Sequence, residues 1–123
     1  MWWLIPLALA APAPGPAWAQ RPFCGYGEGV AGLRQAQEAL SRPVEGLLAG
    51  REAGLTIAGV LDGAHAAFAR CGCPRLAETL AEPARMAESA ASQASVSAVA
   101  ETFRQTGLRI RLARQQLERD GCR

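Results

Sequence analysis

The amino-acid sequence predicts an all-α fold, a small up-down-up-down four-helix bundle that two disulfides cross-link at one pole. Three observations predict it. Apolar residues recur every three or four positions in long alanine-rich segments, which is the spacing of a helix face. The alternation of apolar and polar residues that is typical of strands is missing. Four cysteines lie at the ends of the predicted helices, where short turns would bring them together.

The N-terminal stretch, residues 1–19, is predicted to be a secretory signal peptide. An apolar run over residues 1–11 is too short to cross a bilayer core of about 30 Å as a helix. Small residues at positions 17 and 19 form a cleavage site before Gln20, although the usual basic start is missing. An uncleaved anchor is the alternative, which the prolines of this stretch disfavour. We therefore expect a secreted or periplasmic protein without a stable membrane anchor after cleavage, with residues 20–123 as a single helical domain.

The first two helices are predicted on either side of a proline. Helical spacing of apolar residues runs from Glu28 to Leu40, and Ser41-Arg42-Pro43 then interrupts it. Proline suits the first turn of a new helix, and Glu45 follows where a carboxylate complements the positive end of the helix dipole. We expect the second helix to run from Val44 to Arg70.

The apolar face of this second helix changes phase along its length. Gly46, Gly50 and Gly54 lie in the same region, and each costs about 1 kcal/mol relative to alanine inside a helix. A break between Gly50 and Gly54 is therefore the alternative to a turn at Ser41–Pro43, and it would give three long helices plus a short one. We favour the turn at Ser41–Pro43. The apolar residues before and after the change of phase are Val44, Leu47, Leu48 and Leu55, then Ile57, Leu61, Ala64 and Phe68.

The third helix follows the turn Cys71-Gly72-Cys73. Pro74 opens this helix, at the position where its missing N–H costs nothing. Four serines and a glutamine among small residues predict the next turn between Ser89 and Ser97. The buried face is predicted to comprise Leu76, Leu80, Pro83, Ala87 and Ala91.

The last helix has the clearest apolar seam, with alternating spacings of three and four residues. Gly121 follows it as a helix stop. Leu108 and Leu112 lie off the seam, so they either widen the buried face or form a surface for a partner. The seam comprises Val96, Val99, Phe103, Thr106, Ile110, Ala113 and Leu117.

The four cysteines are expected to meet at one pole. In an up-down-up-down bundle, Cys24 at the start of the first helix, the central Cys71–Cys73 turn and Cys122 at the end of the last helix share that pole. An even number of cysteines in a small exported chain favours disulfides. Two pairings stay open, Cys24 with Cys71 or with Cys73, because a direct Cys71–Cys73 bond has unfavourable geometry. Each cross-link would close a loop of roughly fifty residues, worth about 3–4 kcal/mol.

A reactive turn is the alternative. Cys73 would lie at the N-terminus of the third helix, where the dipole stabilises a thiolate, and a Cys71–Cys73 disulfide would be a strong oxidant. The same pair could instead bind a soft metal such as copper(I) or zinc. The βαβ pattern that usually hosts redox cysteines is missing, and Cys-x-Cys is a weak metal signal. We therefore expect structural disulfides, without a metal or a cofactor.

Catalytic patterns are weak in this sequence. His65 is its single histidine, and no positioned nucleophile accompanies it, so we expect a structural role for it. The serines of residues 89–97 lack the strand–turn–helix setting of a nucleophile elbow. Thirteen basic against eleven acidic residues leave a net charge of +2, which gives no reason to expect nucleic-acid binding. We expect a non-enzymatic protein.

The remaining candidate is a contact surface on the last helix. Four arginines lie within eleven residues of this helix, beside its off-seam leucines. They form either a solvated face with local ion pairs or a surface that binds a partner. We predict a binding or structural role with an unknown ligand, through an unknown protein partner or a homodimer. The candidate interaction face comprises Arg104, Leu108, Arg109, Arg111 and Leu112.

Overall fold

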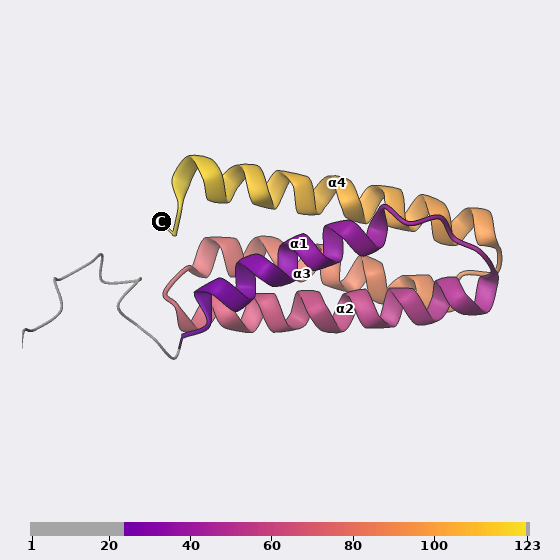
Figure 1. Ribbon diagram of the computed structural model, residues 1–123, viewed down its shortest axis with the longest axis horizontal. Helices are drawn as coiled ribbons and strands as arrows, with labels where there is room; N and C mark the ends of the chain where they lie inside the picture. Colours follow the sequence, from indigo (N-terminus) through magenta and orange to yellow (C-terminus); the bar gives the residue numbers. More distant parts are fainter. Residues whose placement is uncertain (1–23, 123) are drawn as a thin grey trace, which may run out of the picture.

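A computed structural model describes residues 24–122, so the predicted signal peptide lies outside the described residues. Residues 24–122 form helices and turns without a strand, and the helices lie side by side as a bundle (Figure 1). The prediction of an all-α four-helix bundle is confirmed. The elements are α1 (Tyr26–Leu40), α2 (Leu47–Arg70), α3 (Pro74–Ser89), the short 3-10 helix η1 (Ala90–Ser92) and α4 (Val96–Asp120).

The linker between α1 and α2 lies where Ser41–Pro43 predicted it, but it is longer. Helix α2 begins at Leu47, so Pro43 is not in its first turn and Glu45 precedes it. The expected roles of these two residues are wrong. Val44 accounts for the difference, because its side chain packs against the core from the linker and holds residues 43–46 out of helical geometry.

The predicted change of phase in the apolar face of α2 is also wrong. Leu48 and Leu55 are 71% and 52% exposed, whereas Gly50 and Gly54 are buried. The buried positions then follow one unbroken pattern of three- and four-residue steps. They are Gly50, Gly54, Ile57, Leu61, Ala64 and Phe68.

These two glycines let neighbouring elements approach α2 closely. A Cβ at Gly54 would lie 2.7 Å from both the carbonyl oxygen of Ala87 and the Cβ of Ala90. A Cβ at Gly50 would lie 2.9 Å from methyl groups of Val44 and Val99. Such separations are too short for carbon contacts, so the two glycines mark close crossings and not a break in the helix.

Helices α3 and α4 follow the prediction closely. Pro74 opens α3, and α3 ends at Ser89, where the predicted turn begins. The Oγ of Ser95 caps α4 by accepting a hydrogen bond from the backbone N–H of Ala98, at 3.1 Å. The seam of α4 is buried from Val99 to Ala113, whereas Val96 is exposed because it lies in the first turn, beyond the core. Within residues 24–122, no helix is long and apolar enough to cross a membrane.

Candidate functional site

The four cysteines lie together at one end of the bundle. In Figure 1 this is the end where the chain enters α1, where α2 turns into α3 and where the label C marks the end of the chain. Cys24 is bonded to Cys71, and Cys73 is bonded to Cys122, with Cα–Cα distances of 4.9 and 4.8 Å. The predicted convergence is confirmed, and of the two pairings that stayed open the structure has Cys24 with Cys71. We call this end the stapled pole.

The turn between Cys71 and Cys73 directs the two sulfurs to different partners. Gly72 has φ of 76°, in the left-handed region that glycine occupies without strain. The backbone N–H of Cys73 donates to the carbonyl oxygen of Phe68 at 2.9 Å, and that of Gly72 donates to Ala69 at 3.2 Å. This is the Schellman arrangement that ends a helix, and it sends Cys71 toward α1 and Cys73 toward the end of α4.

These sulfurs are buried as well as bonded. Cys71 and Cys73 are 2% and 1% exposed, and the described part of the chain contains no free cysteine. Redox and soft-metal chemistry both begin from an accessible thiolate. The arrangement therefore acts as a pair of covalent cross-links between distant helices.

His65 makes a structural contact. Its Nδ1 lies 2.5 Å from the carbonyl oxygen of Ala77, so this nitrogen donates a hydrogen bond that links α2 to α3. Among residues 24–122, no three histidine, cysteine, aspartate or glutamate side chains are grouped in a way that could hold a metal ion.

The outer face of α4 carries the off-seam leucines. Leu108 and Leu112 are 42% and 56% exposed, so they do not widen the buried core. Arg109 lies on the side of α4 that faces α3, where its Nη2 is 3.4 Å from Oε1 of Glu82. For Arg111, no hydrogen bond or ion pair occurs within the described residues. The five predicted face residues therefore all reach solvent, but they spread over both flanks of the helix.

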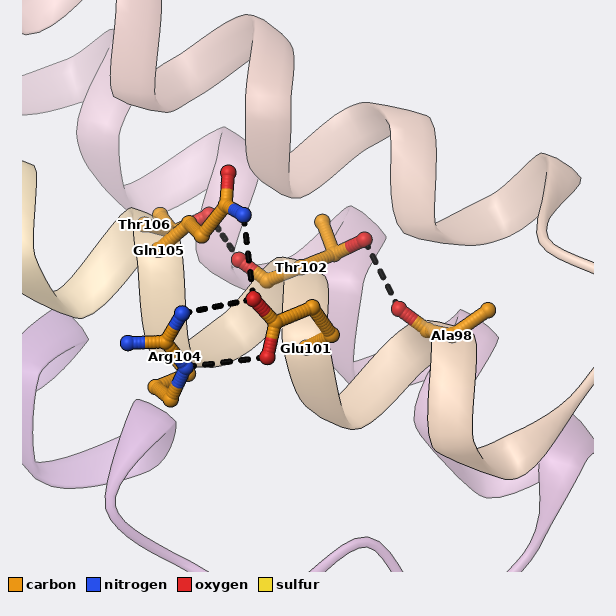
Figure 2. A network of polar contacts seen from close by, with 6 residues as sticks. All are labelled: Ala98, Glu101, Thr102, Arg104, Gln105 and Thr106. Carbon is orange, nitrogen blue, oxygen red and sulfur yellow. Dashed lines mark hydrogen bonds and ion pairs between the residues drawn. The ribbon is translucent and has the colours of Figure 1, made fainter.

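An ion pair with one further hydrogen bond lies on α4 before these leucines (Figure 2). Arg104 donates to both carboxylate oxygens of Glu101, at 2.6 and 2.9 Å, and the side-chain amide of Gln105 donates to Glu101 at 3.0 Å. The pKa of Glu101 is lowered from 4.5 to about 2, mainly by the hydrogen bond from Arg104 and secondly by that from Gln105. The Glu101 carboxylate likewise raises the pKa of Arg104. The network holds these exposed side chains in defined positions.

Two open hollows flank the last turn of α1 and share Phe103 as a wall. One, of about 250 Å³, lies between α1 and α4 and is lined by Leu40, Arg104 and Arg111. The other, of about 500 Å³, lies under the linker 41–46 and is mainly apolar. Neither hollow was predicted from the sequence, because their walls come from segments far apart in the chain; the small residues Ala49, Gly50 and Ala53 on one face of α2 were the available signal.

Comparisons with known proteins return nothing similar. The chain matches no family model, and neither a curated protein nor a solved structure is significantly similar to it.

Proposed function

We propose that this chain is an exported, non-enzymatic binding protein, a disulfide-stapled helical bundle that offers the outer face of α4 to a protein partner. The observation that carries the proposal is the exposure of Leu108 and Leu112 on a helix whose opposite face is buried from Val99 to Ala113. Two leucines beside arginines, at the centre of a long exposed helix face, resemble the apolar centre and polar rim of a protein interface.

Two features support export. Disulfides persist in oxidising compartments outside the cytosol, and this protein carries two that join its ends to its central turn. The sequence of residues 1–19 has the apolar run and small-residue site of a signal peptide. A small helical domain with covalent staples is suited to survive in such a compartment without chaperones.

Export is tested by expressing the full chain in bacterial cells, fractionating them and measuring the intact mass with and without alkylation. We expect a product that begins at Gln20, lies outside the cytosol and takes up alkylating reagent at its four cysteines only after reduction. A full-length cytosolic product with four alkylatable thiols would contradict export.

The binding face is tested by placing a photo-cross-linking residue at position 112 in the same cells. Position 48 is the matched control, because Leu48 on α2 is at least as exposed but lies on another face. We expect a cross-linked adduct from position 112 and none from position 48. No adduct from position 112, or equal yields from both, would overturn the proposed role of α4.

A further inference from the structure

The outer face of α4 carries a second seam, separate from the one buried in the bundle. Six residues follow each other at steps of four, three, four, three and four, and all six are exposed. Such spacing places side chains in one stripe along a helix and is the spacing of a two-helix coiled-coil contact. The six residues are Glu101, Gln105, Leu108, Leu112, Gln115 and Arg119.

This stripe is chemically complementary to a copy of itself that runs in the opposite direction. Leu108 and Leu112 are equally far from position 110, on either side of it. Gln105 and Gln115 form the next equidistant pair, and Glu101 and Arg119 form the outermost pair. Each residue thus has a complement of fitting type, apolar with apolar, amide with amide and acid with base.

A copy of α4 that runs in the opposite direction meets every one of these complements. A two-fold axis at position 110 would place each Leu108 against Leu112 of the second copy. The same axis would place each Glu101 against Arg119 of the second copy, at both ends of a contact about 27 Å long. Interfaces with two-fold symmetry are self-complementary in this way.

Glu101 is prepared for such a contact. Its carboxylate is already held by Arg104 and Gln105 and stays charged over nearly the whole pH range, because its pKa is lowered. Among residues 24–122, Arg119 has only the neighbouring Asp120 as an ion-pair partner, at 3.6 Å and exposed. A carboxylate accepts several donors at once, so a second arginine adds to the first without displacing it.

The flanking arginines limit the strength of the contact. Arg109 and Arg111 lie on either side of the two leucines, where each approaches its own equivalent across the axis. Glu82 compensates the charge of Arg109, whereas no described residue compensates that of Arg111. Like charges that approach each other repel, so Arg111 weakens the contact between the two copies of α4.

We infer that the partner of this face is a second copy of the chain, bound through an antiparallel α4–α4 contact centred on position 110. The inference rests on the proposed function, because it names the occupant of the same surface. A single helix–helix contact lies at the small end of protein interfaces. The dimer therefore forms at protein concentrations of roughly 10 µM to 1 mM.

Sedimentation velocity of the purified oxidised protein over that concentration range tests the inference. Leu108→Ser with Leu112→Ser is expected to weaken dimerisation by at least about tenfold, and Leu48→Ser with Leu55→Ser, on the exposed face of α2, is expected to leave it unchanged. Arg111→Gln is expected to strengthen it. Circular dichroism checks that each variant keeps its helices.

Charge exchange tests the direction of the helices. Glu101→Arg alone or Arg119→Glu alone is expected to weaken the dimer, and the two together are expected to restore it, because the acid–base pair is then only reversed. In a parallel dimer, position 101 would meet position 101 of the second copy, and the double variant would restore nothing.

A monomer at 1 mM, or a dimer that the α4 leucine changes do not weaken, overturns the inference. If position 112 still yields an adduct with a different protein in cells, the proposed function stands and only the second copy is wrong. If position 112 yields no adduct at all and the protein is monomeric, both fail.

Discussion

The two poles of the bundle are held together by different means. At the stapled pole, Cys24, Cys71, Cys73 and Cys122 form covalent cross-links, and the turn between α2 and α3 follows a Schellman arrangement. At the opposite pole, which we call the open pole, packing against Gly50 and Gly54 and two hydrogen bonds hold the linker 41–46 and the turn after η1. Cross-links close the first pole in addition to packing such as that of Gly29 against Phe68, whereas the second pole is closed by packing and hydrogen bonds alone.

The open pole also contains two hydrogen bonds from one arginine and an apolar hollow. The Arg51 guanidinium donates twice to the carbonyl oxygen of Gln93, at 2.6 and 3.0 Å, which ties α2 to the turn before α4. The apolar hollow under the linker lies at the same pole. No cross-link opposes local opening of the open pole, so packing and hydrogen bonds alone hold it closed.

The largest expected effect comes from removing a staple. Replacing Cys73 and Cys122 together with alanine should lower the free energy of unfolding by about 3–4 kcal/mol, because a loop with a sequence separation of 49 is no longer closed. For a domain of this size that corresponds to a fall in melting temperature of roughly 12 °C or more. Thermal unfolding measures it, with the wild type in reductant as a second reference. If the variant and the oxidised wild type melted at the same temperature, the second disulfide would not stabilise the fold.

The next effect tests the close packing of the open pole. Gly54→Ala should destabilise the protein by about 1–2 kcal/mol, because overpacking against Ala87 and Ala90 outweighs the gain in helix propensity. Gly59→Ala is the matched control on the same helix, since a Cβ there meets nothing within 4 Å. The control should stabilise by about 0.4–1 kcal/mol. Urea unfolding compares them, and two variants of equal stability would refute the close crossing.

An effect of the same order is expected in the turn of the stapled pole. Gly72→Ala forces a residue with a Cβ to φ of 76° and should cost about 1–2 kcal/mol. The cross-links on either side keep the turn closed in the variant, so urea unfolding should show the cost with both disulfides still formed. A variant as stable as the wild type would show that the turn does not need glycine.

The smallest effect concerns Glu101, in the second turn of α4. Its pKa is lowered from 4.5 to about 2 in the folded protein, so its charge is stabilising above pH 4.5 and that contribution is lost as the pH falls through 2. The wild type should therefore melt slightly higher than Glu101→Gln at pH 6, and the difference should vanish toward pH 2. Exposed pairs contribute little. A difference that grows at low pH would have the wrong sign.

The sequence predicted the stapled pole better than the open one, for a physical reason. Cysteine positions and the seam of α4 are explicit in the sequence, so helix order alone brings the sulfurs together. The choice between Cys71 and Cys73 as the partner of Cys24 stayed open, because both pairings close loops of nearly equal length. In the first half of α2, apolar periodicity selected Leu48 and Leu55, whereas the structure buries Gly50 and Gly54.

That error is general to close crossings. Hydrophobic periodicity detects side chains that gain by leaving water, but where two backbones approach closely, the buried position carries no side chain. On α4 the sequence separated the core seam from Leu108 and Leu112, but whether these leucines face solvent depends on how neighbouring helices are placed. Ion pairs across helices, such as Arg109 with Glu82, depend on the same placement.

The disulfides also determine how tension passes through the molecule. From Cys24 the covalent path runs across the first disulfide to Cys71, through Gly72 to Cys73, and across the second disulfide to Cys122. A pull applied to the chain at Cys24 and at Cys122 is carried by these few bonds, and every helix lies in a loop that bears no tension. In its oxidised form the domain would hardly lengthen under force, whereas reduction would allow all four helices to be drawn out.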